Sequence, residues 1–299
     1  MKPLRIGTRR SKLALAQAEE IRRLLTAHGT PSELVPMSTS GDEGAPASAS
    51  PAGLKGLFVD AILEALESGN IDLAVHSAKD LPAEEDDGGF VIAAVPERAD
   101  ARDVLVTKGA TLGPGARVGT SSLRRRAQLL RSGAGISVVQ LRGNVDTRLR
   151  KLEEGEVDAV VLAAAGLARL GVSPQHATVL SVDEMMPAPG QGCLAVQCRD
   201  DDERIRGLLA PLDHVSSHVA LEAERSLMWR LGGGCNLPFG AYATVDVGLV
   251  RLTALVATPD GGEIARAGGE ADSAEGAAAV TARALIEAGA EAILEELVE

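Results

Sequence analysis

The stretch GNIDLAVHSAKDL at residues 69–81 decides the fold, because a near copy of it, GEVDAVVLAAAGL, occurs at residues 155–167. The two stretches share Gly, Asp, Val, Ala and Leu at equal spacing and without gaps. In each copy a short apolar run follows the Gly and the Asp, which predicts strands over Ile71–Val75 and Val157–Leu162. A chain of 299 residues is long enough for several such units. The repeat therefore indicates two related α/β lobes.

A second repeat has the order strand, Gly-Thr turn, arginine and helix. The predicted strand Leu4–Gly7 precedes an amphipathic helix that carries Leu13 and Leu25, and Arg117–Gly119 precedes a helix over residues 123–131. Both lobes are predicted to be of the parallel type, with ligands bound at strand ends between them. The further elements we expect in the lobes are helices Leu57–Glu67 and Val145–Leu152 and strands near 91–95, 103–107 and 137–142.

The last part of the chain has a different pattern, which predicts a small α+β domain. Its expected elements are helix 217–231, strands at 241–247, 249–257 and 263–270, and one helix over 274–297. Asp200–His214 is expected to be a return segment and linker. The predicted division is 1–96 with 193–214 for domain 1, 97–192 for domain 2 and 215–299 for domain 3.

The composition excludes several classes of protein. A net charge of -12 and five aromatic residues argue against nucleic-acid binding. No apolar stretch is long enough to span a membrane, and no signal core precedes the first strand, so we expect no membrane partner and a cytoplasmic location. Three cysteines without a matching His fit reducing conditions and no metal site. Arginine clusters in so acidic a chain suggest a small anionic ligand.

The Lys79-Asp80 pair follows the first repeated strand, whereas its counterpart in the second copy is Ala165-Gly166. The fold therefore does not require a charged pair there. A surface ion pair or a helix cap before Pro82 is the alternative. At a strand end in a cleft, a carboxylate can stabilise a cation that develops during a reaction.

The turn Gly119–Ser122 offers hydroxyl and backbone N–H groups at a helix start, and arginines follow one turn later. This arrangement suits carboxylates, although a single arginine run more often forms a solvated helix face. Arginines recur near other predicted strand ends, which favours anion binding. The recurring ones are Arg9, Arg10, Arg142, Arg148 and Arg169.

Three glycines precede Cys235 and leave its sulfur room for a large covalent group, although an isolated cysteine is more often a small buried side chain. The spacing lacks the Lys-Ser/Thr of a phosphate loop. We expect structural roles for His76, Cys193 and Cys198. The low-complexity stretch 41–53 is either a lid or disordered.

The motifs VHSAKDLP (75–82), VGTSSLRRR (118–126), LRGNV (141–145) and GGGCNLP (232–238) occur together and in this order. With TRRSKLAL, LKGLF, LAAAGLARLG and PAPGQG, they resemble the signature set of the porphobilinogen deaminase (hydroxymethylbilane synthase) family. The resemblance implies two lobes like a type II periplasmic binding protein and a third domain whose cysteine, matched by Cys235, bears a dipyrromethane cofactor through a thioether. It also implies a monomeric transferase that joins four porphobilinogen molecules into hydroxymethylbilane and releases ammonia at each addition, without metal or nucleotide.

The resemblance also implies roles for individual residues. Asp80 matches the catalytic aspartate, which would stabilise an azafulvenium-like cation. Positions that match cofactor-binding residues are Ser77, Lys79, Asp80, Thr120, Ser121, Ser122, Arg124 and Arg125. Positions that match binding residues for substrate and growing chain are Arg9, Ser11, Gln17, Arg142, Arg148 and Arg169. Lys55 and Phe58 are assigned to the lid.

Two other classes of function remain open on the residues alone. A non-catalytic two-lobed binding protein for a small organic polyanion would use the arginines but would not need Cys235. An adapter or structural protein would leave the Lys79-Asp80 pair and the repeated arginine turns unexplained.

Overall fold

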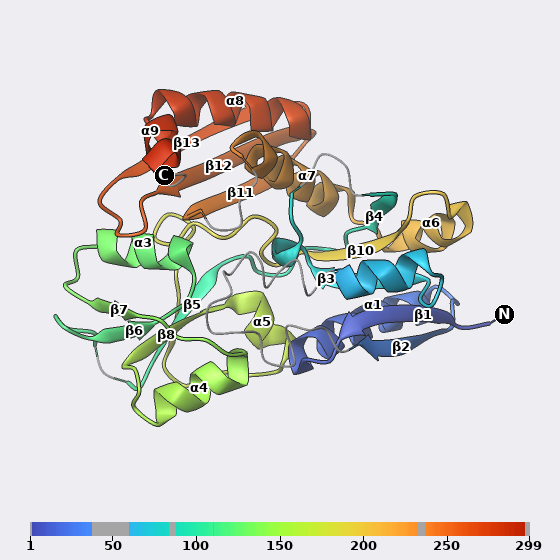
Figure 1. The fold of residues 1–299 in the computed structure, drawn as a ribbon, viewed down its shortest axis with the longest axis horizontal. Helices are drawn as coiled ribbons and strands as arrows, with labels where there is room; N and C mark the ends of the chain where they lie inside the picture. The colour runs from blue at the N-terminus through green and yellow to red at the C-terminus, as the bar shows by residue number, and fades with distance from the viewer. Residues whose placement is uncertain (1, 38–59, 84–87, 110, 233–236, 297–299) are drawn as a thin grey trace.

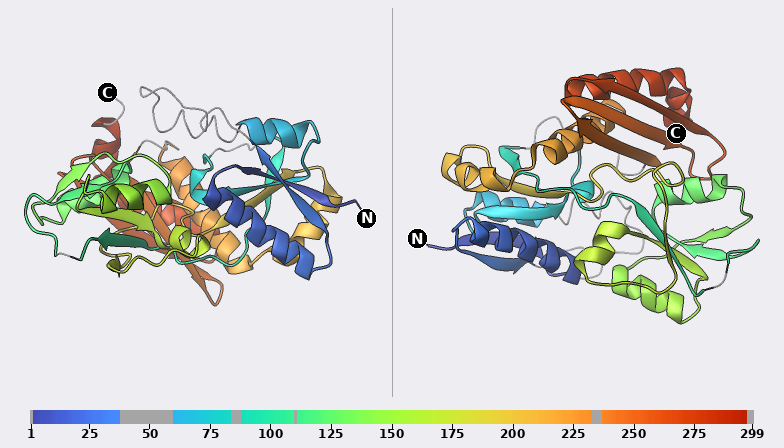
Figure 2. Two further views of the ribbon diagram at one scale, coloured as in Figure 1. Left: turned by 90° about the horizontal axis from the view of Figure 1, so that it is seen from below. Right: turned by 180° about the vertical axis from the view of Figure 1, so that it is seen from behind.

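A computed structural model describes residues 2–37, 60–83, 88–109, 111–232 and 237–296. In this part of the chain the strands form two five-stranded sheets and one three-stranded sheet. Figures 1 and 2 show the three-stranded sheet, with its helices, on one side of the two larger sheets. The predicted class, two α/β lobes with a C-terminal α+β domain, is confirmed.

The first lobe contains a sheet with the order β2-β1-β3-β10-β4. Apolar side chains of its strands, such as Ile6 and Leu73, pack against Ile21 and Leu25 of the flanking helix α1 (Lys12–Ala27). The Ser11 side chain caps that helix by accepting from the Ala14 N–H. The strands are β1 (Leu4–Arg9), β2 (Ser32–Met37), β3 (Leu73–Ser77), β4 (Phe90–Ala94) and β10 (Leu194–Arg199).

The second lobe repeats this order strand for strand as β7-β6-β8-β5-β9. β3 and β8 are the two repeated strands of the sequence. Each lies third in its sheet and is parallel to the second strand, β1 or β6. The predicted duplication is therefore also a repeat of the topology. The strands are β5 (Asp103–Thr107), β6 (Arg117–Gly119), β7 (Ser137–Val139), β8 (Ala159–Ala163) and β9 (Ala177–Val179).

The prediction that both lobes are of the parallel type was wrong for the fourth strand of each sheet. β10 is antiparallel to β3, and β5 is antiparallel to β8. Each of these strands is fed by a segment that crosses from the other lobe: the outward crossing segment (residues 95–102) leads into β5, and the return crossing segment (residues 180–193) leads into β10. Because the chain arrives at the carboxyl end of the parallel strands, it can only run back along them.

Helices cover the sheets, and a short helix follows each of the two repeated strands. β3 runs into the single turn η1 and β8 runs into α5, so the two copies diverge directly after the strand. Residues 60–67 are helical as well. The remaining helices are η1 (Ala78–Asp80), α3 (Leu123–Arg131), α4 (Val145–Glu153), α5 (Ala164–Arg169), α6 (Glu203–Leu209), η2 (Ala210–Leu212), α7 (Val215–Arg230), α8 (Ala274–Glu287) and α9 (Ala290–Glu296).

The third domain packs α7, α8 and α9 against an antiparallel sheet in the order β11-β12-β13. The prediction of one helix over 274–297 was wrong, because Gly289 has a φ of 96° and separates α8 from α9. The segment expected to be a linker also contains α6 and η2. The strands are β11 (Phe239–Asp246), β12 (Leu249–Ala257) and β13 (Ile264–Ala271).

Each sheet draws all its strands from one of the three predicted domain ranges, and the boundaries themselves remain a prediction. Among the described helices, none combines the length and the apolar character that crossing a lipid bilayer requires.

Arg98 and Glu224 form a buried ion pair where the two lobes and the third domain meet. Arg98 lies in the outward crossing segment, and its Nη1 is 2.7 Å from Oε1 of Glu224 on α7. The Glu224 carboxylate is completely buried, and it also accepts from the backbone N–H groups of Gly190 (2.6 Å) and Ala243 (2.7 Å). One carboxylate thus connects both crossing segments, α7 and β11.

We expect Glu224→Ala to lower the free energy of unfolding by about 3–5 kcal/mol, because it leaves the buried Arg98 guanidinium without its counter-ion. Urea denaturation followed by circular dichroism measures this change. Glu222→Ala, on the exposed side of the same helix, is the matched control and should change little. Equal unfolding midpoints for the two variants would contradict the assigned role of Glu224.

Candidate active site

A cavity of about 820 Å³ lies between the two lobes, at the carboxyl ends of their parallel strands. Its walls come from the segments that follow β1, β3, β6, β7 and β8, from α1 and from the return crossing segment. It brings together most of the residues that the sequence singled out. Those lining it are Arg9, Ser11, Gln17, Ser77, Lys79, Asp80, Ser121, Arg125, Arg142, Arg148 and Arg169.

The cavity wall is strongly cationic although the chain as a whole is acidic. Among the described residues, seven Lys or Arg side chains line it and two carboxylates, those of Asp80 and Asp146, do so. Asp146 is paired across the mouth of the cavity with Lys12, at 2.6 Å. An arrangement of this kind attracts and holds a ligand with several carboxylates.

The Lys79-Asp80 pair forms the turn η1 at the end of β3 and projects into the cavity. Ser77, the last residue of β3, accepts a 2.6 Å hydrogen bond from Gln17 Nε2, which fixes the turn against α1. Burial lowers the pKa of Lys79 to about 8, and the Asp80 carboxylate opposes this shift. The prediction that this pair lies in a cleft between the lobes is confirmed, whereas its role in a reaction is not tested by the geometry.

His76 lies on the same wall, although we expected a structural role for it. Its side chain is buried, and its Nε2 has no hydrogen-bond partner among the described residues. Burial lowers the pKa of His76 to about 4, a shift that the nearby Asp80 opposes and Arg9 reinforces. The imidazole is therefore neutral at physiological pH.

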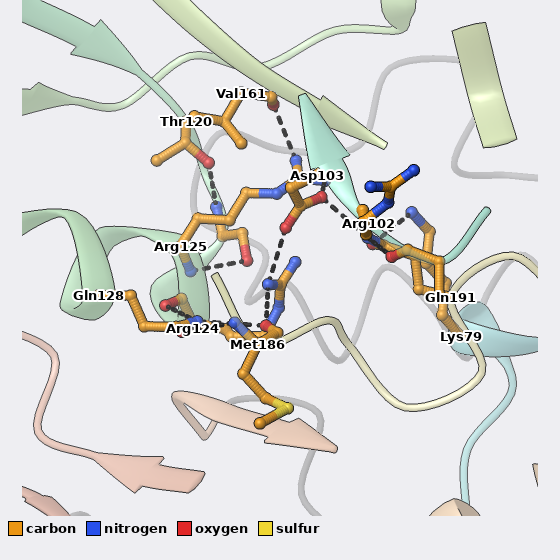
Figure 3. A network of polar contacts seen from close by, with 12 residues as sticks. Lys79, Arg102, Asp103, Thr120, Arg124, Arg125, Gln128, Val161, Met186 and Gln191 are labelled. Carbon is orange, nitrogen blue, oxygen red and sulfur yellow. Dashed lines mark hydrogen bonds and ion pairs between the residues drawn. The ribbon is translucent and has the colours of Figure 1, made fainter. Parts of the chain in front are cut away.

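Arg124 and Arg125 share one buried carboxylate, that of Asp103 at the start of β5 (Figure 3). Arg124 Nη1 is 2.9 Å from Asp103 Oδ2, and Arg125 Nη2 is 2.7 Å from Asp103 Oδ1. Backbone carbonyls of Met186 and Val161 accept further bonds from the two guanidinium groups. The two positive charges hold the pKa of Asp103 well below its usual range despite its burial.

Three residues expected to bind the cofactor do not line the cavity. The Arg124 side chain is 5% exposed and points to Asp103 and Met186, so it supports the site from behind. The Thr120 hydroxyl accepts from the Ser122 N–H, and the Ser122 hydroxyl caps α3 by accepting from the Arg125 N–H. The turn uses these hydroxyls to build itself, and only Ser121 and Arg125 face the ligand space.

The arginines of the second lobe differ in how firmly they are held. Arg169 is paired with Glu20 of the first lobe at 2.9 Å. Arg148 donates from Nε to the Gly143 carbonyl, and burial together with Arg125 lowers its pKa to about 10. Arg142 is exposed at the rim. The cavity thus offers both fixed and adaptable cations.

Cys235, Lys55 and Phe58 lie outside the described residues. Cys193 and Cys198 are buried, and burial raises their pKa values to about 12 and about 11, so both remain thiols. Within the described residues, no cluster of His, Cys, Asp and Glu could hold a metal ion.

Sequence reasoning missed Asp103 and Gln191, which connect the site residues to one another. Gln191 Nε2 donates to Asp103 Oδ1 at 2.8 Å, and its Oε1 is 3.5 Å from Lys79 Nζ. Asp103 had one visible signal, a single charge at the start of an apolar strand. Gln191 had one as well, its place in the motif PAPGQG, but the motif does not reveal its partners, which are far away in the sequence.

Two family models match the chain: "Porphobilinogen deaminase, dipyromethane cofactor binding domain" over residues 4–207 and "Porphobilinogen deaminase, C-terminal domain" over residues 219–288. The chain is 46% identical to the porphobilinogen deaminase of Syntrophotalea carbinolica, with 98% of this chain and 96% of the relative covered. It is 45% identical to that of Geobacillus kaustophilus, with 99% and 98% covered.

Among solved structures, the chain is similar to a periplasmic substrate-binding protein of an ABC transporter from Coxiella burnetii. The TM-score is 0.42 at 17% identity, and the alignment covers 70% of this chain and 91% of the other.

The buried neutral His76 predicts a loss of stability in acid. The unfolded chain takes up this proton near pH 6.5 and the folded chain near pH 4, so stability is present above about pH 6.5 and falls as the pH drops toward 4. The loss should approach roughly 3 kcal/mol. We expect this contribution to the acid-induced loss of stability in wild type and in the control variant His176→Gln, because His176 is exposed. The variant His76→Gln should lack this contribution. Equal pH dependence of unfolding in all three proteins would refute this.

Proposed function

The chain belongs to the porphobilinogen deaminase family, and we propose that the cavity between its lobes is the active site. The enzyme joins four porphobilinogen molecules head to tail on a dipyrromethane cofactor, releases ammonia at each addition and liberates hydroxymethylbilane for tetrapyrrole synthesis. The non-catalytic binding protein is not favoured, because the match to a cofactor-binding domain covers residues 4–207.

One observation supports the location best: in the part of the chain that the structure describes, cationic side chains outnumber carboxylates seven to two on the cavity wall, although the protein is acidic. Each pyrrole unit carries an acetate and a propionate group, so every addition brings two more carboxylates into the site. Charge-assisted hydrogen bonds contribute about 1.5–3 kcal/mol each, and several of them select a polycarboxylate over a neutral analogue.

The residues present fit a dipyrromethane. Ser77, Lys79 and Arg125 face one region of the cavity and can donate to its carboxylates, while Arg124 holds Asp103 in place behind them. Ser121 is assigned to the same set and lines the same region, with its hydroxyl donated to the Leu141 carbonyl at 2.6 Å. We assign the attachment of the cofactor to a thioether with Cys235. When bound, the cofactor would supply the pyrrole carbon to which the first substrate is joined. Thr120 and Ser122 contribute by shaping the turn that presents Ser121 and Arg125.

Asp80 is proposed to be the catalytic residue. Its carboxylate faces the cavity beside Lys79, where it can stabilise the positive charge that develops on the substrate as ammonia leaves the aminomethyl carbon. A fixed carboxylate in a partly enclosed site is effective because it needs no reorganisation when the charge appears.

The remaining cavity residues are proposed to hold the substrate and the growing chain. Ser11 caps α1 and Gln17 lies on it, opposite the arginines of the second lobe, so carboxylates can be bound from both sides. The proposed binding residues are Arg9, Ser11, Gln17, Arg142, Arg148 and Arg169.

Further properties of the protein belong to the proposal. We infer a transferase that acts as a monomer in the cytoplasm, without nucleic acid or membrane as partner. The net charge of -12 and two buried, unpaired thiols are consistent with this. We also infer that Lys55 and Phe58 belong to a lid, and that the domain boundaries lie at 96/97, 192/193 and 214/215.

The purified protein should carry one covalent dipyrrole, because the family's cofactor stays bound between turnovers. Intact mass spectrometry should detect this adduct in wild type and not in Cys235→Ser. Cys193→Ser, which removes a buried thiol with a raised pKa, is the matched control and should keep the adduct. An adduct retained in Cys235→Ser would remove Cys235 from this role.

Asp80→Ala should fold and should consume porphobilinogen about 10²–10³ times more slowly than wild type, because it removes a carboxylate aimed at a developing cation. Asp146→Ala removes the other carboxylate of the cavity and should cost far less, since Asp146 is paired with Lys12 at the mouth. Steady-state consumption of porphobilinogen measures both. Similar losses in the two variants would contradict the assignment of Asp80.

A further inference from the structure

Gln191 occupies a buried position between the two charged groups of the site that come from different lobes. It lies in the return crossing segment, is 1% exposed and has Lys79 of the first lobe on one side and Asp103 of the second lobe on the other (Figure 3). Its backbone carbonyl accepts a 2.9 Å hydrogen bond from Arg98 Nε, so the residue is anchored as well as enclosed.

The orientation of the Gln191 amide is fixed by its neighbours. One end of the amide is 2.7 Å from the Ala101 carbonyl and 2.8 Å from Asp103 Oδ1. Both of these groups can only accept, so this end must be the NH2 group. The oxygen therefore faces Lys79 Nζ, at 3.5 Å, and can accept from the ammonium.

The backbone beside Gln191 is built for this close approach. Gly190 has a φ of 70°, and a Cβ there would lie 2.9 Å from the backbone nitrogen of Lys79. Any larger residue would push the return crossing segment away from η1. Glycine at position 190 thus allows the return crossing segment to come close enough for the Gln191 side chain to lie beside Lys79.

We propose that Gln191 is a positioning residue, which holds the Lys79 ammonium at a fixed place relative to the Asp103–Arg125 pair of the second lobe. Its donors keep Asp103 oriented toward Arg125, and its acceptor directs Lys79. The relevance to carboxylate binding rests on the proposed function, because Lys79 and Arg125 are the cations assigned there to the cofactor from opposite lobes.

The pKa of Lys79 tests the proposal without any turnover, so a failure of the proposed function would not change the result. The chain has only six lysines. Methylating them reductively with isotope-labelled formaldehyde lets each be titrated by NMR, and Lys79→Arg identifies the signal of Lys79. The wild-type value should lie well below 10.5, near 8.

Two substitutions of similar size should move this value differently. Gln191→Met removes the acceptor that stabilises the ammonium and should lower the pKa of Lys79 further, by roughly half a unit or more. Gln191→Glu retains an acceptor and adds negative charge, so the pKa should stay unchanged or rise. A role in packing alone would not give this order.

Gln128→Met is the matched control. Gln128 is also a buried glutamine that holds the return crossing segment, through the backbone of Met186, but it does not line the cavity. It should lower stability and leave the pKa of Lys79 unchanged. A folded Gln191→Met variant in which Lys79 has the wild-type pKa would overturn the proposal. If the methionine variant does not fold, a pKa of Lys79 in Gln191→Glu below the wild-type pKa would overturn it as well.

Discussion

The buried ion pair of Arg98 and Glu224 is the interaction on which the arrangement of the three domains depends. Removing two charges from water costs several kcal/mol per ion, and only good geometry with further hydrogen bonds offsets that cost. Both conditions hold, because backbone N–H groups of the return crossing segment and of β11 saturate the carboxylate. The pair therefore specifies where the crossing segments lie, and their position in turn sets the distance between the lobes.

The cavity depends on that placement. Arg98 fixes the backbone of Gln191, Gln191 reaches Asp103, and Asp103 orients Arg125 toward the ligand space. Buried contacts of Gln191 and Asp103 thus support the inner wall of the cavity, whereas the exposed pair of Lys12 and Asp146 spans its mouth. Firm cations at the back and adaptable ones at the rim suit a ligand that is anchored at one end and lengthens at the other.

The repeated stretch and the arginine turns were enough to predict two lobes, a cleft between them and most of the residues on its wall. The direction of β5 and β10 was not predictable from local patterns, because it follows from where the chain enters each sheet. The different positions of Arg124 and Arg125 were not predictable either. In the sequence the two are indistinguishable, and both pair with Asp103, but only Arg125 also lines the cavity.

The two copies of the repeat differ in what their corresponding residues contact. Asp80 in the first copy corresponds to Gly166 in the second, and Gly166 lies on α5, which packs against α1 of the opposite lobe. A Cβ at this position would lie in van der Waals contact with Leu13 Cδ2, at 3.7 Å. A longer, charged side chain would therefore extend against an apolar side chain of the opposite lobe. The two copies of the repeat differ at the position where one faces the ligand space and the other faces the neighbouring lobe.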